Sequence, residues 1–240
     1  MCTRYFIEQD APELKDILSA VIGSSLADKF IRTHGRPIIT SGEMRPTDIV
    51  PVIAPNQKGI KSVFPMQWGF TNKEHNTSHF NARIEAAGTK PTFRDSWKSH
   101  RCIVPASYYF EWQHFISPDG KTKTGNKYAI QPKGQTVTWL CGLYRIEEGY
   151  PVFVVLTKEP TYALRKIHDR MPFMLPGERI DEWINPSSNP DEFIQYALEE
   201  IVMEKATQDD SRQIFSEIHI KILFKKFLTY HQNASDRTYM

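Results

Sequence analysis

The spacing of apolar and polar residues predicts a helix near the N-terminus. Over about residues 11–31, apolar side chains recur every three or four positions. They form one face, made of Leu14, Ile17, Leu18, Val21 and Ile22. Asp10 can cap this stretch and Pro12 suits its first turn, so we expect one continuous helix.

The centre of the chain has the shorter runs that are typical of strands. They cover residues 49–54, 60–68, 101–104, 107–113, 128–131, 137–144 and 152–157. Turn-forming residues separate them, as in Pro118-Asp119-Gly120 and Pro132-Lys133-Gly134. Several short strands at close spacing predict an antiparallel, partly closed sheet.

Helical patterns return after this strand-rich centre, at about residues 159–168, 177–184 and 190–205. Residues 211–230 fit two patterns: part of the stretch alternates like a strand, and part has helical spacing. The whole predicts one domain of the α+β class, with a sheet-rich centre and flanking helices.

Composition narrows the class of protein. The 240 residues are 40% hydrophobic and 24% charged, which is typical of globular domains and excludes collagen, coiled coil or disorder as the overall class. No apolar run approaches the roughly 18–20 residues that a membrane helix needs, and no signal peptide is visible. We therefore expect a cytoplasmic protein with no membrane partner. The three widely spaced cysteines predict neither a disulfide framework nor a metal knuckle.

Charge is distributed unevenly along the chain. Residues 186–240 hold 6 Lys+Arg and 9 Asp+Glu, so the mildly basic remainder carries 24 and 19. Such a distribution permits a nucleic-acid partner without requiring one. Common nucleotide-binding loops and the serine-hydrolase elbow are absent from the sequence.

Cys2 is the most informative residue. A small side chain after Met1 permits removal of the initiator methionine, which would leave Cys2 with an α-amine and a thiol. Their reference pKa values of about 7.7–8.0 and about 8.5 leave part of each group deprotonated near neutral pH. Such an aminothiol converts an aldehyde into a Schiff base and then closes a thiazolidine ring. The alternative is that a cysteine at position 2 is incidental.

Three further segments carry polar residues in apolar surroundings. Asn81 and Arg83 are two apart, and therefore on one side of an extended chain. Glu111 lies in an aromatic run, where burial would raise its pKa and suit it to proton transfer. His168 precedes Arg170 near the end of a predicted helix. Taken singly, each could be structural: a turn cap, a surface ion pair or a residue at the end of a helix.

Taken together, these segments resemble the SRAP family, the SOS response-associated peptidases or abasic-site processing proteins. The resemblance covers about residues 1–186. It rests on Met1-Cys2-Thr3-Arg4-Tyr5, Trp68-Gly69-Phe70, Asn81-Ala82-Arg83-Ile84-Glu85, Arg101-Cys102-Ile103-Val104-Pro105-Ala106, Tyr109-Phe110-Glu111-Trp112, Cys141-Gly142-Leu143-Tyr144 and Ile167-His168-Asp169-Arg170-Met171-Pro172. Residues 187–240 are expected to be a helical extension packed on the same domain.

The resemblance implies a curved, barrel-like antiparallel sheet and a catalytic Cys2. Its ligand would be single-stranded DNA with an abasic site, whose ring-opened aldehyde Cys2 would trap as a thiazolidine crosslink. Asn81 would orient the reacting group, Glu111 would move protons at the amine, and His168 would act on the sugar oxygen.

The same resemblance implies a DNA-contacting group. Arg4, Arg83 and Arg170 would hold the phosphates that flank the lesion, and Trp68 would support or stack an adjacent base. No metal or organic cofactor is implied, and we expect a monomer that associates with the nucleoid when it acts on DNA.

This sequence departs from the family pattern at Thr3, where glycine is usual. Two other functions stay open on the sequence alone. One is a thiol peptidase, including an autopeptidase that releases its own Met1 and does not crosslink DNA. The other is a module that binds single strands without catalysis.

Overall fold

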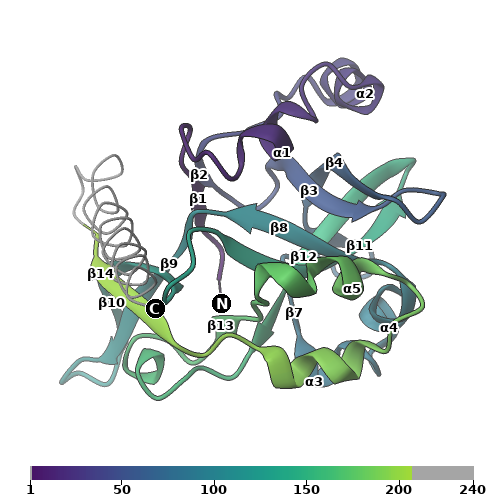
Figure 1. Cartoon of the computed structure of the whole chain (residues 1–240). Helices are drawn as coiled ribbons and strands as arrows, with labels where there is room; N and C mark the ends of the chain where they lie inside the picture. Colours follow the sequence, from purple (N-terminus) through teal and green to yellow (C-terminus); the bar gives the residue numbers. More distant parts are fainter. Residues whose placement is uncertain (1, 207–240) are drawn as a thin grey trace, which may run out of the picture.

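Five strands close into a barrel at the centre of the protein. The computed structural model describes residues 2–206. Within it, the strands follow the order β11 (Thr138–Glu147), β8 (Arg101–Ala106), β3 (Ile49–Pro55), β4 (Lys61–Trp68) and β12 (Tyr150–Lys158). Because β11 also pairs with β12, this path closes on itself. The expected α+β fold, with a curved barrel-like core and flanking helices, is confirmed (Figure 1).

A second, five-stranded sheet lies beside the barrel. Its order is β14 (Ile201–Lys205), β10 (Thr122–Pro132), β9 (Tyr108–Ile116), β1 (Tyr5–Ile7) and β2 (Gly42–Met44), and every pair in it is antiparallel. Two short strands, β5 (Phe70–Asn72) and β6 (Thr77–His79), pair with each other. In Figure 1 the N-terminal segment lies between the β9–β10 hairpin and β13 (Met171–Pro172).

The predicted antiparallel sheet has an exception at β12. This strand pairs in parallel with β4 and with β7 (Asn81–Arg83), and antiparallel with β13. Parallel pairing requires a longer connection than a hairpin, and the chain supplies it as α3 (Ile84–Ala87) and α4 (Pro91–Ser99), followed by other strands of the barrel. The pairing brings Asn81 and the segment after His168 to the same strand, although the end of β7 at Arg83 precedes His168 by 85 positions.

Successive side chains of the barrel strands point to opposite faces and pack into two separate cores. Val152, Val154 and Leu156 of β12 pack in the cluster that includes residues of α3, α4 and α5 (Ile180–Ile184). Phe153 and Val155 pack in the other cluster, which also contains Cys2. The period of two in the sequence therefore places the N-terminal cysteine in one core and the helices over the other.

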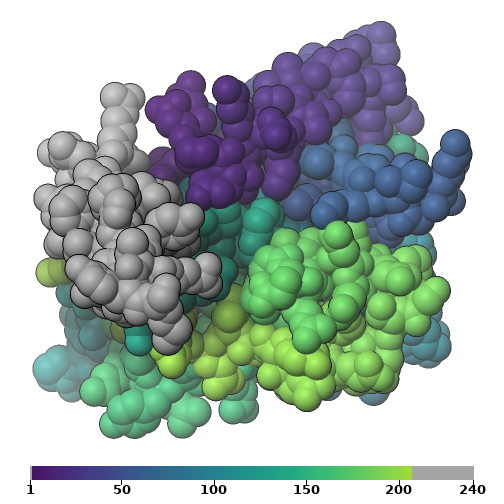
Figure 2. All heavy atoms as spheres, viewed as in Figure 1, coloured from purple at the N-terminus to yellow at the C-terminus, as the bar shows by residue number. Residues whose placement is uncertain are grey.

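The single helix predicted over residues 11–31 is two helices, α1 (Lys15–Ser19) and α2 (Ser25–His34). Gly23 adopts φ +71°, a left-handed conformation that ends helical geometry at no steric cost to glycine. Ser24 then caps α2, because its hydroxyl accepts a hydrogen bond from the Ala27 N–H at 3.2 Å. A helix-capping residue inside the apolar pattern thus divides the predicted helix into two. In the space-filling view this segment forms the upper edge of the face shown (Figure 2).

The later helical predictions are correct only in part. Residues 177–184 form a 3-10 turn (η2, Gly177–Arg179) and α5, as expected. Within 159–168 only the 3-10 turn η1 (Leu164–Lys166) is helical. Residues 190–205 were expected to be one helix, but they form the 3-10 helix η3 (Pro190–Tyr196) followed by β14, whose backbone pairs with β10 from Tyr128 to Pro132. The ambiguous stretch 211–230 lies outside the described residues, as does the rest of the extension beyond residue 206.

Candidate active site

Cys2 lies in the protein core at the start of β1. Strand β1 runs between β2 and β9, and this position holds the residues just before it against the barrel. The side chain of Cys2 is fully buried, and its Sγ donates a weak hydrogen bond to the carbonyl oxygen of Arg4 at 3.7 Å. Burial first, and the negative charge of Glu111 second, raise the pKa of the Cys2 thiol far above its ordinary value. The thiol is therefore neutral at pH 7.

Glu111 is a buried carboxyl group on β9. Only 2% of the residue is exposed, and its Oε1 has no hydrogen-bond partner among the described residues. Removal from water, reinforced by the nearby negative charge of Asp169, raises the pKa of Glu111 to about 8. The carboxyl group therefore carries its proton through most of the neutral range. The burial of Glu111 agrees with the sequence argument, and its role in proton transfer stays a prediction.

His168 faces Glu111 from the loop between η1 and β13. Its Nε2 lies 3.8 Å from Oε2 of Glu111, which is longer than a hydrogen bond. Its Nδ1 accepts from the Arg170 N–H at 3.1 Å and lies 3.0 Å from Oδ1 of Asp169. Burial lowers the pKa of the His168 imidazole most, and the positive charge of the amino terminus lowers it next. Asp169 opposes this shift, and His114 adds a smaller lowering of the pKa.

The two contacts at Nδ1 belong to different tautomers of the neutral ring. A proton on Nδ1 is donated to Asp169 and leaves the neutral ring with a basic Nε2, which can take a proton in the cavity. Without that proton, Nδ1 accepts from the Arg170 N–H and Nε2 carries the hydrogen. Exchange between these states lets His168 move a proton at Nε2.

Glu111 and His168 line one cavity with Thr3. The cavity has a volume of about 240 Å³, and its other lining residues are Trp112, His114 and Thr124. Its walls come from the N-terminal segment, the β9–β10 hairpin and the loop that carries His168. The structure thus brings Cys2, Glu111 and His168 into one region: Glu111 and His168 line the cavity, and the buried Cys2 is close enough to Glu111 for its charge to act on the thiol.

Asn81 is the fourth residue predicted to be catalytic. It lies on β7, opposite Val155 of β12, and both atoms of its amide are buried with no hydrogen-bond partner among the described residues. The hydroxyl groups of Tyr5 and Tyr109 are also buried without a hydrogen-bond partner among the described residues. Buried polar atoms without partners are uncommon in folded proteins and are costly unless a ligand or water satisfies them. The amide is therefore available to a ligand, although no hydrogen bond joins it to Glu111 among the described residues.

Two of the predicted DNA-binding residues reach the surface. Arg83 is exposed at the end of β7. Arg4 is partly exposed, and its guanidinium pairs with Glu43 at 3.2 Å and donates to the Thr3 carbonyl at 2.7 Å. Contact of either arginine with phosphate stays a prediction.

The other two residues of that group are buried in the structure. Arg170 is 7% exposed and donates to both carboxylate oxygens of Glu85, at 3.1 and 2.9 Å, and to the Thr157 carbonyl at 2.7 Å. This guanidinium therefore joins α3 to β12, and contact of Arg170 with phosphate stays a prediction.

Stacking of a base on Trp68 is corrected. Its ring is fully buried, stacks on Phe153 with centroids 5.9 Å apart, and donates from Nε1 to the Phe80 carbonyl at 2.8 Å. Because that hydrogen bond holds the residue just before Asn81, Trp68 keeps only the supporting role that the sequence allowed as an alternative.

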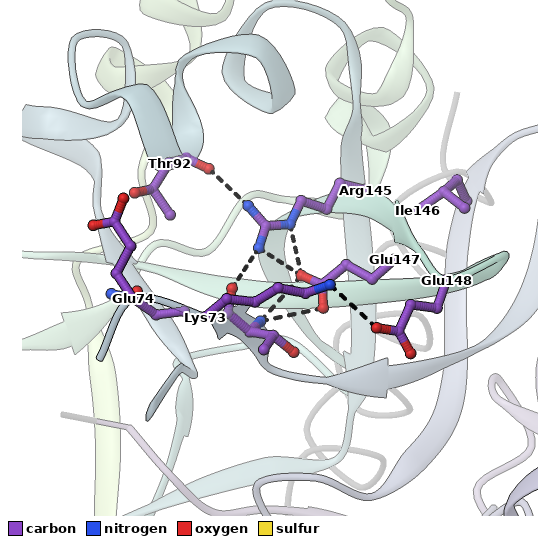
Figure 3. A pocket seen from close by; sticks show the side chains of 9 residues that line it. Lys73, Glu74, Thr92, Arg145, Ile146, Glu147 and Glu148 are labelled. Carbon is purple, nitrogen blue, oxygen red and sulfur yellow. Dashed lines mark hydrogen bonds and ion pairs between the residues drawn. The ribbon is translucent and has the colours of Figure 1, made fainter. Parts of the chain in front are cut away.

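A larger cavity of about 570 Å³ lies away from these residues, between β5 and the end of β11 (Figure 3). Four of its charged groups form ion pairs with one another. The Arg145 guanidinium lies 2.5 Å from Glu147 and donates to the Thr71 carbonyl at 2.9 Å, while Lys73 pairs with Glu148 at 3.3 Å. None of the predicted site residues lines it, so it gives no support to the predicted chemistry.

Sequence reasoning missed His114, Trp112 and Thr124 as cavity residues. Trp112 follows Glu111 directly and could have been suspected, whereas nothing in the sequence singled out His114. Among residues 2–206, no cluster of three or more His, Cys, Asp or Glu side chains could hold a metal ion. The helices in this range include none long and apolar enough to cross a membrane.

Comparison with known proteins shows which family matches this chain. The family model described as SOS response associated peptidase (SRAP) matches residues 1–213. Abasic site processing protein YoaM of Bacillus subtilis is 36% identical over 123 residues, which cover 49% of this chain and 52% of that protein. Abasic site processing protein YMR114C of Saccharomyces cerevisiae is 28% identical over 249 residues, covering 91% and 63%. The match to YoaM thus spans about half of that relative's length.

Solved structures support the fold. A protein from Bacteroides thetaiotaomicron superposes with a TM-score of 0.65 at 21% identity, covering 87% of this chain and 93% of its own. A phage-related protein from Bordetella bronchiseptica gives a TM-score of 0.64 at 18% identity, covering 86% and 95%. At these identities the likeness concerns the fold alone.

Proposed function

This chain belongs to the SOS response associated peptidase (SRAP) family, and on that premise we propose that it processes abasic sites by covalent trapping. The substrate is single-stranded DNA with an abasic site, and the nucleophile is Cys2 after removal of Met1. The observation that carries the proposal is the placement of Cys2 in the core beside Glu111, with Glu111 and His168 lining a cavity of about 240 Å³. A deoxyribose without its base is a group of suitable size for that space.

Ring opening comes first in the proposed reaction. The closed sugar is a hemiacetal, and opening it moves one proton from the anomeric hydroxyl to the ring oxygen. Neutral His168 takes the hydroxyl proton at Nε2 and returns it to the ring oxygen. No proton is gained or lost overall, and the product is an aldehyde held in the cavity.

The α-amine of Cys2 then attacks the aldehyde carbon. Glu111, which is protonated at pH 7, gives its proton to the departing hydroxyl, and loss of one water leaves an iminium ion that keeps its N–H. Addition of the Cys2 sulfur to the iminium carbon closes the thiazolidine, and the thiol proton returns to Glu111. Asn81 is proposed to orient the reacting group with its unpaired amide.

The state of the Cys2 thiol favours this route over a thiol peptidase. A peptidase needs a thiolate as its attacking group, and burial keeps the thiol of Cys2 protonated. Trapping begins with the amine and needs the sulfur only after the imine has formed. The proposal includes a location in the cytoplasm, with association with the nucleoid when the protein is bound to DNA. It also includes action as a monomer.

A gel assay with a labelled abasic oligonucleotide tests the proposal. Wild-type protein without Met1 is expected to give an adduct that survives heating. Cys2→Ser keeps the amine and removes the sulfur, so it should give only a transient imine that becomes stable after borohydride reduction. Equal heat-stable adducts from both proteins, or none from the wild type, would reject trapping. Cleavage of a peptide that depends on Cys2 would favour the peptidase instead.

A further inference from the structure

His114 lies against the His168 imidazole from the β9–β10 hairpin. The two ring centroids are 5.2 Å apart and the ring planes are tilted by 55°. The backbone N–H of His114 also donates to the carbonyl oxygen of Ile167 at 3.1 Å. One residue of β9 therefore contacts both the ring of His168 and the chain that carries it.

A break in the strand register lies beside His114. The pairing of β9 with β10 shifts between Thr124 and Lys127, where β10 contains an extra residue. Such a bulge increases the local twist of the paired strands. Residues 111 and 114 are three apart, and therefore on opposite faces of a regular strand. Glu111 and His114 nevertheless both line the cavity, together with Thr124, which pairs with His114.

We propose that His114 is a positioning residue for His168: its ring sets the orientation of the imidazole, and its charge disfavours a second positive charge on that ring. The inference rests on the proposed function, because its consequence is that His168 stays neutral and able to take a proton from the sugar. His114 itself is exposed at the mouth of the cavity.

Charges of both signs face His168. Glu111 of β9 lies 3.8 Å from Nε2, and Asp169 of the same loop lies 3.0 Å from Nδ1. The positive charges of His114 and of the chain's amino terminus act in the opposite sense to Asp169. Arg170 contributes its backbone N–H, since its side chain is paired with Glu85. Loss of positive charge at position 114 therefore makes protonation of His168 easier, so that the neutral ring appears only at higher pH.

The test uses the full-length protein without Met1 in two variants, His114→Gln and His114→Lys. Histidine ring resonances, followed by NMR from pH 5 to pH 8.5, report the titration of His168 directly. Crosslinking rates measured over the same range report the consequence. Gln113→Ala is the matched control, because it changes the neighbouring residue on the same strand and leaves both imidazoles in place.

For His114→Gln we expect the His168 titration and the acid limb of the crosslinking profile to move to higher pH. Crosslinking should be at least about threefold slower than wild type at pH 6, and the difference should shrink towards pH 7.5. His114→Lys keeps a positive charge, so its titration should stay at or below the wild-type position.

Two outcomes would overturn the inference. One is an unchanged His168 titration in both variants, and the other is an equal upward shift in the Gln and Lys variants or in the control. Because the NMR titration needs no DNA, it also separates this inference from the proposed function. Absence of any wild-type adduct would count against trapping, whatever His114 does to His168.

Discussion

The Nε2 atom of His168 lies 3.8 Å from Oε2 of Glu111, and this pair is neutral at pH 7. Burial raises the pKa of the carboxyl group to about 8 and lowers that of the imidazole below its ordinary value. The usual order of the two pKa values is therefore inverted: the carboxylic acid holds its proton and the imidazole does not. A proton donor and a proton acceptor thus face one cavity without an ion pair between them.

Glu111→Gln is expected to slow crosslinking by about 100-fold or more, because an amide cannot exchange the proton that a general acid supplies. The affinity for an intact single strand should change less than twofold, since Glu111 is buried. Rates come from single-turnover gels and affinities from fluorescence anisotropy. Glu74→Gln, an exposed change at the other cavity, is the control. A comparable loss of rate in the control, or a large loss of binding in Glu111→Gln, would contradict the assigned role.

The raised pKa of Glu111 also predicts how stability varies with pH. Between the unfolded value of 4.5 and the folded value of about 8, the folded protein binds more protons than the unfolded chain. The contribution of Glu111 to the free energy of unfolding is fully present below pH 4.5, and it is lost as the pH rises towards 8. Its slope approaches about 1.4 kcal/mol per pH unit.

Urea unfolding between pH 5 and pH 8 measures that slope. The free energy of unfolding of the wild type should fall across this range more steeply than that of Glu111→Gln, which has no proton to lose. Parallel curves for the two proteins would mean that Glu111 titrates normally in the fold.

Arg83→Ala is expected to weaken binding of single-stranded DNA and to lower the salt dependence of binding. Each lost phosphate contact reduces the slope of log K against log salt by about 0.7 for a single strand. Lys61→Ala removes a charge that is paired with Asp181 of α5, and it should leave the slope unchanged. An unaltered slope in Arg83→Ala would remove this residue from the DNA-contacting group.

Arg170→Ala is expected to lower stability, since it leaves the Thr157 carbonyl and one face of Glu85 without their partner. A loss of about 2–4 kcal/mol in the free energy of unfolding is typical for a buried charged hydrogen-bond donor. Arg165→Ala, an exposed change in the preceding turn, should cost less than about 0.5 kcal/mol. Chemical denaturation at pH 7 compares them, and equal stability of the two variants would show that the Arg170 contacts contribute little.

Local patterns predicted much of this fold. The seven strand-like runs appear as β3, β4 and β8 to β12, because alternation and turn residues act over a few positions. The errors arose where distant pairing decides the outcome. Residues 201–205 have apolar positions at helical spacing, yet they form β14 because the edge of β10 offers them backbone partners.

The candidate site shows the same division. Residue type singled out Cys2, Asn81, Glu111 and His168, the family resemblance gave them catalytic roles, and three of them lie in one region. The sequence could not show that Trp68 and Arg170 are buried, since exposure depends on what packs over them. It could not identify His114 either, because the contact of this residue with His168 depends on how the loop before β13 packs against β9.

Intact-protein mass spectrometry tests the central claim most directly. Protein without Met1 is incubated with a single-stranded oligonucleotide carrying one abasic site, and the product is then digested and mapped. The account predicts a heat-stable species whose mass is the sum of protein and oligonucleotide minus one water, with the linkage at Cys2. Protein of unchanged mass, or an adduct mapped to another residue, would contradict covalent trapping by Cys2.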